Sequence, residues 1–213
     1  MSKVKLAVFA SGNGSNLQAL MDAARSRPGA PVEIALVVSD RRNARALERA
    51  RDAGVDAVYI SPKRAGGRAE FDAAAVRELE ARGVQLIALA GFMRILGADF
   101  VRRYENRILN IHPSLLPAFP GTRAIQDAWE HGVKTTGVTV HYVDEGVDTG
   151  PIAAQCPTLI RPNDTIETLT AKIHAVEHAL YPQVVFAAAE GRVRVHGRLV
   201  TIKPPAIQLP PVR

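Results

Sequence analysis

Residues 107–117 read RILNIHPSLLP, an apolar run that ends in polar side chains and two prolines. The apolar start predicts a buried strand. Pro113 lacks an amide hydrogen and restricts His112 to extended angles, so the chain is expected to leave the sheet there. Period-two alternation places Asn110 and His112 on one face of the strand. Such groups at the carboxyl end of a strand are typical of ligand sites in open α/β sheets, although a capped strand end with a structural histidine is an equal alternative.

Hydrophobic patterns on both sides of this strand predict alternating strands and helices. Strands are expected at 4–9, 32–38, 57–60, 86–90, 135–143 and 152–159. Helices are expected from Leu17 and at 43–53, 71–82, 124–131 and 165–189, the last capped by Asp164 or Thr165. The alternation favours one α/β domain over residues 1–213, with a doubly wound, mostly parallel sheet of about seven strands. We expect a flexible basic loop at 63–68, a C-terminal hairpin at 192–201 and a loosely held tail from Pro204.

The composition is that of an ordinary globular chain, with 47% hydrophobic and 23% charged residues among 213. It contains no apolar run of about 18 residues and no signal-peptide pattern, so we expect a cytoplasmic protein that does not bind membranes. The single cysteine, Cys156, excludes an internal disulfide and argues against a cysteine-ligated metal site. The net charge of +6 comes from scattered arginines, and aromatic residues make up only 5% of the chain. This pattern favours acidic small molecules over nucleic acid.

A glycine-rich loop, SGNGSN at residues 11–16, follows the first predicted strand and precedes a helix. Two close glycines let backbone N–H groups approach an anion, and Ser15 or Asn16 can cap a helix whose N-terminus carries about half a positive charge. The loop lacks the third glycine of a dinucleotide motif and the lysine of a Walker loop. It therefore predicts a phosphomonoester site, with a plain tight turn as the alternative.

Two further loops follow predicted strands. Residues 91–97 read GFMRILG and place apolar side chains where they can form a wall for a flat hydrophobic ligand. Residues 144–150 read DEGVDTG, and their three carboxylates resemble part of a calcium loop. The spacing departs from that of a calcium loop and the final glutamate is missing, so we predict no metal there.

Five motifs together resemble those of the folate-dependent formyltransferases. They are the loop 11–16, AGFMRIL at 90–96, NIHPSLLPAFPG at 110–121, DEGVDTGP at 144–151 and EHALYP at 177–182. The resemblance implies a Rossmann-like fold and transfer of a formyl group from 10-formyltetrahydrofolate to the amine of glycinamide ribonucleotide in de novo purine biosynthesis, without a metal. It also implies small-molecule partners, no nucleic acid and no membrane, and a monomer or weak homodimer.

The resemblance assigns roles to individual residues. The implied catalytic residues are Asn110, His112 and Asp148. The implied phosphate-binding residues are Gly12, Asn13, Gly14, Ser15, Asn16 and Arg68, and Glu177 is implied to bind the substrate amine or ribose. The implied folate-binding residues are Met93, Arg94, Ile95, Leu96, Val143, Asp144, Glu145, Gly146 and Val147. On this assignment about residues 1–105 bind phosphate, about 106–190 catalyse and bind folate, and 191–213 form a hairpin and tail.

The chemistry sets further expectations. Formyl transfer to an amine passes through a tetrahedral intermediate, which needs a hydrogen-bond donor for its oxyanion and a route for protons. Asn110 and His112 can supply donors, and a nearby carboxylate is expected to keep His112 protonated by raising its pKa. We read His141 as a core histidine without a catalytic role. We also expect a cis peptide bond between Leu116 and Pro117, because the chain must turn sharply beside the site.

Three other functions remain open. Methionyl-tRNA formyltransferase needs an additional RNA-binding domain and a formyltetrahydrofolate deformylase needs a regulatory domain, and 213 residues leave room for neither. A phosphate-ligand sensor would keep the glycine loop but has no need for the Asn110, His112 and Asp148 set. The sequence also departs from the family pattern. His174 stands where relatives can carry a phosphate-binding lysine, and Arg123 and Ile125 stand where others have histidines, so the accessory phosphate contacts differ.

Overall fold

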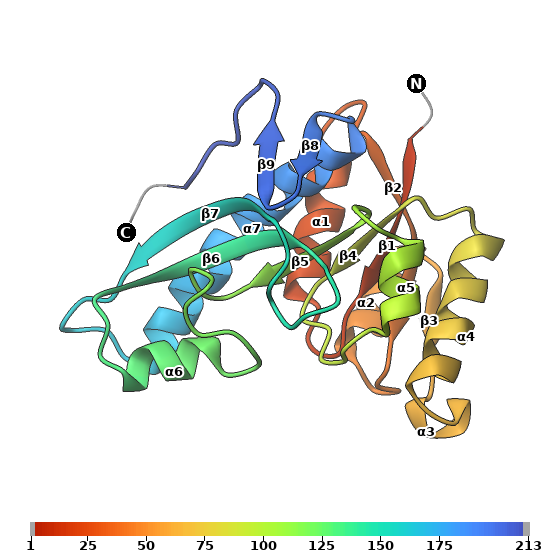
Figure 1. Ribbon diagram of the computed structural model, residues 1–213, viewed down its shortest axis with the longest axis horizontal. Coiled ribbons are helices and arrows are strands. Elements are labelled where there is room, and N and C mark those ends of the chain that lie inside the picture. The colour runs from red at the N-terminus through yellow and green to blue at the C-terminus, as the bar shows by residue number, and fades with distance from the viewer. Residues whose placement is uncertain (1–2, 211–213) are drawn as a thin grey trace. The chain divides into compact units, whose positions relative to one another are not determined.

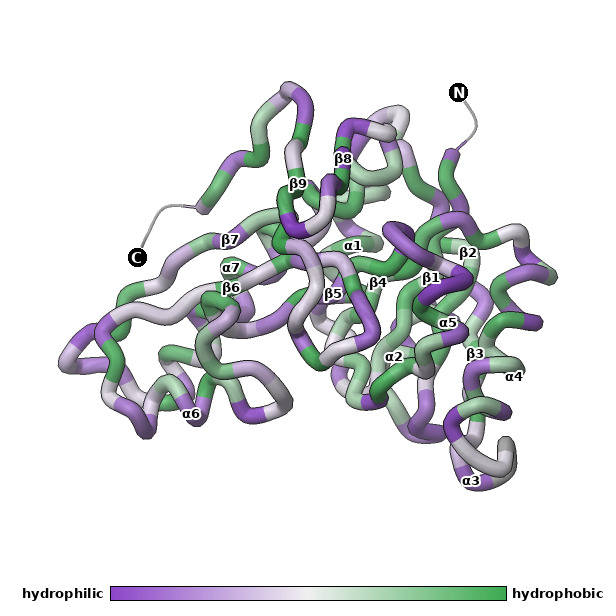
Figure 2. The backbone as a smooth tube through the Cα atoms, in the orientation of Figure 1, coloured by the Kyte–Doolittle hydropathy of each residue, from purple (hydrophilic) through white to green (hydrophobic). Residues whose placement is uncertain are grey.

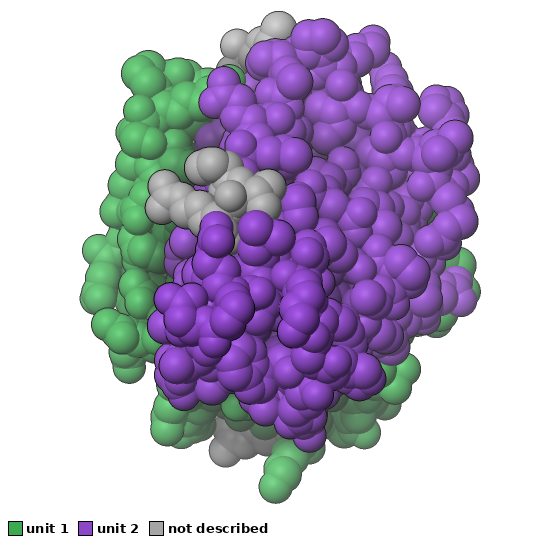
Figure 3. Space-filling view, turned by 90° about the vertical axis from the view of Figure 1, so that its left-hand side faces the viewer, with its two compact units in different colours: residues 1–109 green, residues 110–213 purple. Residues whose placement is uncertain are grey.

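The computed structural model describes residues 3–210, which divide into two compact units, residues 1–109 and 110–213 (Figure 3). Unit 1 contains β1 (Val4–Phe9), α1 (Ser15–Ser26), β2 (Val32–Ser39), α2 (Arg45–Asp52), β3 (Ala57–Tyr59), α3 (Pro62–Ala65), α4 (Arg68–Ala81), β4 (Leu86–Leu89) and α5 (Ala98–Arg103). The strand β5 (Ile108–His112) spans the boundary. Unit 2 continues with α6 (Ala124–Glu130), β6 (Thr135–Tyr142), β7 (Ile152–Leu159), α7 (Ile166–Ala189), β8 (Val193–His196) and β9 (Leu199–Ile202).

The strands β1 to β7 form a seven-stranded sheet in the order β3-β2-β1-β4-β5-β6-β7 (Figure 1). β1 pairs in parallel with β2 and β4, and β2 pairs in parallel with β3, whereas β6 and β7 are antiparallel. β8 and β9 form a separate antiparallel hairpin. The predicted α/β class, the mostly parallel sheet and the C-terminal hairpin are therefore confirmed.

The core of unit 1 is built on the central strands. Residues 6–9 of β1 and Ala10, which follows it, are fully buried, and β4 is buried along its length. β4 is apolar throughout, and β1 is apolar from Leu6 to Phe9, which is the pattern of parallel strands covered on both faces; these parts are coloured hydrophobic in Figure 2. This buried frame fixes the point where the glycine loop leaves β1.

Three elements differ from the sequence-based prediction. The prediction of a flexible loop at 63–68 is wrong, because α3 occupies residues 62–65. The helix α4 begins at Arg68 rather than at Phe71. Pro62 stands at the first helical position, where its fixed φ and missing N–H are tolerated. Phe71 is the first buried residue of α4, so hydrophobic periodicity could not detect the exposed turn before it. The helix α5 was not predicted either, because its six residues are too few to show a hydrophobic period.

The helix α7 packs against β6 and β7 and carries the main apolar face of unit 2. Thr165 caps its N-terminus: its hydroxyl accepts from Thr168 N–H, and the Thr168 hydroxyl accepts from Thr165 N–H. This reciprocal pair confirms Thr165 as the N-cap. The helix continues through Pro182 to Ala189. Within the described part of the chain, no helix has the length and hydrophobicity to cross a membrane.

The turn that follows β5 is fixed by the neighbouring strands of unit 2. The Thr139 hydroxyl on β6 accepts from Leu116 N–H at 3.1 Å and donates to Ser114 O at 2.7 Å. The Gln155 amide on β7 donates to Leu116 O at 2.9 Å. The Leu116–Pro117 peptide bond is cis, as expected. In the turn at residues 113–121, the backbone polar groups of Ser114 and Leu116 are thus held by β6 and β7.

The C-terminal segment 204–210 is held to the fold, so the prediction of a loose tail is wrong there. The Gln183 amide on α7 donates to Gln208 O at 2.9 Å and accepts from Gln208 N–H at 2.8 Å. The Arg192 guanidinium donates to two carbonyls at residues 203 and 205. Sequence composition gave no sign of these partners, which come from distant elements. Residues 211–213 lie outside the described residues.

Candidate active site

Unit 2 brings together the three residues that are predicted to be catalytic. Asn110 and His112 lie two residues apart on β5, and Asp148 lies in the loop after β6. The Asn110 amide nitrogen is 3.4 Å from Asp148 Oδ1, and His112 Nδ1 is 3.4 Å from Asp148 Oδ2. One carboxylate therefore faces both strand residues. Its position beside His112 is the one that proton transfer through a His112–Asp148 pair would require.

Asp148 is held in an unusual backbone conformation. Its φ is 55°, in the left-handed region that costs a non-glycine residue roughly 1–3 kcal/mol when the surroundings impose it. Gly121 N–H donates to Asp148 Oδ2 at 2.8 Å and fixes the carboxylate. The loop is closed tightly two residues later, because a Cβ on Gly150 would lie 1.8 Å from Tyr142 O. Gly121 in the turn after β5 and Gly150 in the loop after β6 thus help to direct this carboxylate at β5.

His112 is buried, with only 3% of its surface exposed. Burial lowers the pKa of His112, and His141 acts in the same direction; these effects outweigh the Phe119 carbonyl and the Asp148 charge, which raise it. The carboxylate does raise the pKa, but the expectation that it keeps His112 protonated is wrong, because desolvation of the charged ring is the larger effect. His112 Nε2 lies 2.8 Å from Phe119 O and must carry a proton. In the neutral ring Nδ1 is then an acceptor beside Asp148.

Asp148 remains ionised although it is half-buried. Burial acts to raise its pKa, but the hydrogen bond from Gly121 N–H and the two neighbouring imidazole rings, His141 and His112, together outweigh burial, so the pKa is lowered. A carboxylate with this many donors prefers the charged form. At neutral pH the site thus holds an anionic acceptor next to a neutral imidazole.

His141 belongs to the same cluster, and our sequence-based interpretation missed this. Its Nε2 lies 3.1 Å from the Asn110 amide nitrogen and 3.6 Å from Asp148 Oδ1. Its Nδ1 lies 2.8 Å from Tyr142 O, so Nδ1 carries a proton and the Nε2 lone pair accepts from Asn110 in the neutral ring. The signal in the sequence was a histidine at the end of a predicted strand, just before the DEGVDTG loop.

The loop at 143–147, which is predicted to bind folate, is organised by its own carboxylate. Asp144 Oδ1 accepts from Gly146 N–H at 3.1 Å and from the Thr149 hydroxyl at 2.7 Å. Val147 is 49% exposed and Glu145 is exposed. The Asp144 side chain therefore shapes the loop, and Val147 and backbone groups are the parts that a ligand can meet.

In unit 1 the glycine loop connects β1 to α1. The N-cap of α1 is Gly14, with φ 75° and no side-chain cap, so the prediction that Ser15 or Asn16 caps the helix is wrong. A residue in this conformation turns the chain directly into the helix, and only glycine adopts it without cost. The first N–H groups of α1 receive no side-chain cap and can serve an anion.

Ser11 links the start of this loop to its surroundings. It is buried, and its hydroxyl donates to Asp40 Oδ1 at 2.6 Å and accepts from Met93 N–H at 2.9 Å. Ser11 N–H also donates to Gly91 O at 3.1 Å. Ser11 thus joins the glycine loop to the 91–97 loop of unit 1. No short sequence motif identifies this connection.

The 91–97 loop exposes two apolar side chains. Met93 and Ile95 are 52% and 53% exposed, whereas Leu96 is only 6% exposed and supports the loop from within the core. The Arg94 guanidinium lies over the Phe71 ring, 5.1 Å from its centroid. The predicted apolar wall therefore consists of Met93 and Ile95.

Arg68 and Glu177, the remaining predicted site residues, lie on helices. Arg68 is the exposed first residue of α4 and lies beside Asp72, whose Oδ2 accepts from Gly97 N–H at 2.7 Å. Burial raises the pKa of Asp72, against the opposing effects of Gly97 N–H and the Arg68 and Arg94 charges. Glu177 is 5% exposed on α7. Burial, followed by the charge of Glu177, raises the pKa of Tyr181 on the same helix.

Comparisons with known proteins identify the family of the chain. Residues 4–185 match the family model described as Formyl transferase. The chain is 46% identical to phosphoribosylglycinamide formyltransferase of Bacillus subtilis, over 85% of this chain and 92% of that protein. It is 48% identical to the trifunctional purine biosynthetic protein adenosine-3 of Drosophila pseudoobscura pseudoobscura over 89% of this chain, but spans only 14% of that protein's length. A solved glycinamide ribonucleotide transformylase 1 from Symbiobacterium toebii has 48% identity and a TM-score of 0.90, with 94% of each chain covered.

Proposed function

Because the chain belongs to the formyl transferase family, we propose that it transfers a formyl group from 10-formyltetrahydrofolate to the amine of glycinamide ribonucleotide in purine biosynthesis. The observation that carries the proposal is the cluster of Asn110, His112 and Asp148, with one carboxylate 3.4 Å from each partner. Relatives whose names state this activity match most of the chain. A phosphate sensor would have no use for the buried histidine and aspartate pair.

The proposed mechanism assigns a task to each member of the cluster. As the substrate amine attacks the formyl carbon, Asn110 donates to the developing oxyanion the amide hydrogen that otherwise faces Asp148 Oδ1, and its other amide hydrogen stays on His141 Nε2. The His112–Asp148 pair accepts the proton that the amine loses and returns it to the folate nitrogen that leaves. A neutral His112 next to an ionised Asp148 suits this role, because the pair starts without the proton.

Binding is assigned within each unit separately. In unit 1 the N–H groups of residues 12–16 hold the substrate phosphate, with Arg68 as an additional cation, and Met93 and Ile95 form part of the pterin wall. In unit 2 the 143–147 loop holds the folate, and Glu177 binds the substrate amine or ribose. We further propose that residues 1–213 act as a single cytoplasmic formyltransferase domain, as a monomer or weak homodimer, without a metal.

The direct test is an acceptor assay with the purified protein and 10-formyltetrahydrofolate. Tetrahydrofolate should form only when glycinamide ribonucleotide is present, and the product should be its formylated amine. Water and methionyl-tRNA serve as alternative acceptors in parallel reactions. Formate release without an acceptor, or transfer to the tRNA alone, would reject the proposal in favour of the deformylase or the tRNA enzyme.

We expect the replacement His141→Ala to lower kcat about tenfold and to leave both KM values nearly unchanged. His141 Nε2 accepts the amide hydrogen that orients Asn110, and one net hydrogen bond is worth about 0.5–1.5 kcal/mol. His196→Ala is the matched control, because His196 is exposed on β8 and has no side-chain contact among the described interactions. Steady-state kinetics of both variants decide the matter, and an unchanged kcat for His141→Ala would contradict the assignment.

The pH dependence of kcat/KM should show a loss of activity on the acid side. The lowered pKa of His112 keeps the ring neutral above the ordinary histidine value of about 6.5, and protonation in acid removes the acceptor. In Asp148→Asn the residual acid limb should move to lower pH, because the anion no longer stabilises the imidazolium. A rate that instead declines as the pH rises from about 6 to 8 would indicate that a cationic His112 is required.

A further inference from the structure

The glycine loop of unit 1 rests on the helix α2. Ala46 N–H donates to Gly12 O at 3.2 Å. A Cβ built on Gly14 would lie 2.8 Å from both Cα and Cβ of Ala46, so the loop and the helix are in close contact. Any side chain of α2 that lies one turn further along the same face can therefore reach the tip of the loop.

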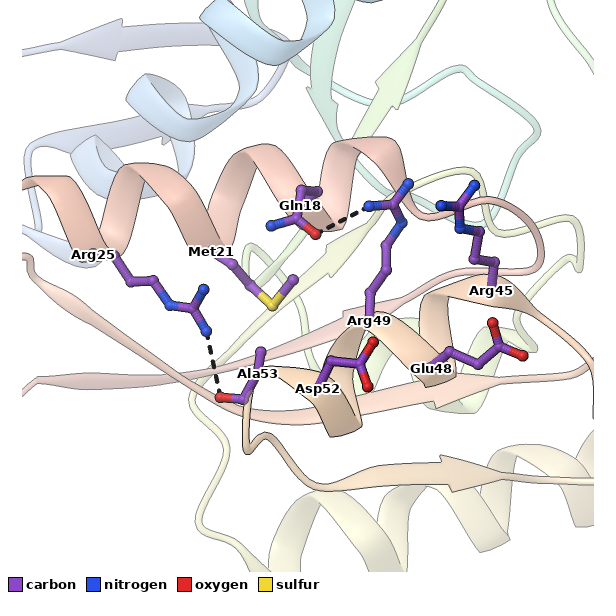
Figure 4. A pocket seen from close by; sticks show the side chains of 8 residues that line it. All are labelled: Gln18, Met21, Arg25, Arg45, Glu48, Arg49, Asp52 and Ala53. Carbon is purple, nitrogen blue, oxygen red and sulfur yellow. Dashed lines mark hydrogen bonds between the residues drawn. The ribbon is translucent and has the colours of Figure 1, made fainter.

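Arg49 is that side chain, one turn after Ala46. Its Nε donates to Asn13 O at 2.9 Å, and one terminal nitrogen donates to Asn13 Oδ1 at 3.0 Å. The other terminal nitrogen donates to Gln18 Oε1 on α1 at 3.1 Å (Figure 4). A planar guanidinium with fixed donor directions thus joins the loop tip to the first turns of α1.

The surroundings of Arg49 argue against a separate ligand site. It lines an open pocket of about 300 Å³ between α1 and α2, together with Gln18, Met21, Arg25, Arg45, Glu48, Asp52 and Ala53 (Figure 4). The lining mixes two carboxylates with three arginines, so it presents no single charge to a ligand. Arg45 points along the same pocket without a described bond to the loop, which makes it a matched comparison.

We propose that Arg49 is a positioning residue that holds the glycine loop in its phosphate-binding conformation. This rests on the proposed function, in which the loop receives the phosphate of the substrate. Asn13 is exposed, and without Arg49 its carbonyl and side chain lose both of their hydrogen bonds to the guanidinium at the loop tip. Backbone N–H groups bind an anion tightly only when they are aimed beforehand, because ordering the loop costs binding free energy. Arg49 acts through the loop, since Nε and both terminal nitrogens each donate to a protein oxygen.

The test compares Arg49→Gln, Arg49→Lys and Arg45→Gln in steady-state kinetics with the full chain. Arg49→Gln should raise the KM for glycinamide ribonucleotide about tenfold, with the KM for the folate and kcat at saturation within about twofold. Arg49→Lys keeps the charge but not the fork, so it should retain most of the defect. Arg45→Gln removes the same charge one turn away and should stay within about twofold of the wild type.

Three results would overturn the proposal: an unchanged KM in Arg49→Gln, full rescue by Arg49→Lys, or an equal defect in Arg45→Gln. The last two would show that charge alone matters. Thermal unfolding of each variant, with and without inorganic phosphate, provides a second measurement that does not depend on turnover. The stabilisation by phosphate should shrink in both Arg49 variants and persist in Arg45→Gln. Failure of the wild type to use glycinamide ribonucleotide would instead reject the proposed function, while the phosphate measurement still tests Arg49.

Discussion

Replacing Asp148 with asparagine is expected to lower kcat by about 10²–10⁴-fold and to leave the KM for glycinamide ribonucleotide within about threefold. Asparagine has the same shape and can still accept the hydrogen bond from Gly121 N–H, so the loop should keep its conformation. It cannot accept a proton, and it no longer balances a cationic His112 during the reaction. The loss should therefore appear in turnover, as measured by steady-state kinetics at saturating substrates.

The matched control for this variant is Asp144→Asn in the same loop. Asp144 organises the loop through Gly146 N–H and the Thr149 hydroxyl but has no described contact with β5. Its replacement should change the KM for the folate more than kcat. If Asp148→Asn weakens affinity and turnover equally, Asp148 is a binding residue and the proposed proton transfer through it is wrong.

Replacing Gly14 with valine is expected to raise the KM for glycinamide ribonucleotide by about 10²-fold or more and to lower the free energy of unfolding. The φ of 75° costs an L-residue roughly 1–2 kcal/mol, and more when it is β-branched. The new Cβ would also lie 2.8 Å from Ala46, so the loop or α2 must shift. Both effects displace the N–H groups that are proposed to bind phosphate.

Gly12→Val separates blocked access of the phosphate from displacement of the loop. A Cβ on Gly12 has no neighbour within 4 Å and the residue does not have a left-handed φ, so unfolding by heat should be close to that of the wild type. The side chain would nevertheless stand where a phosphate must approach, and the KM for the ribonucleotide should rise. A titration in which only folate binding weakens in Gly14→Val would reverse the assignment of the glycine loop.

The sequence by itself was sufficient for the features that depend on local pattern. The unbroken apolar run of β4 and the mostly apolar β1 identified buried strands, and Asp164 or Thr165 followed by apolar periodicity identified α7 and the region of its cap. The motifs identified Asn110, His112 and Asp148 as a group, because a long motif retains the residues that chemistry needs. Short elements such as α3 and α5 were missed, since fewer than two helical turns leave no detectable period.

Only the tertiary structure decided how these residues are tuned and supported. The sequence suggested a raised pKa for His112, but the direction depends on burial against the nearby charge, and burial is the larger effect. His141 and Arg49 joined the candidate sites because β6 and α2 bring them to Asn110 and Asn13. Desolvation and hydrogen bonds between distant segments arise only when the chain is packed, so no local pattern of residues encodes them.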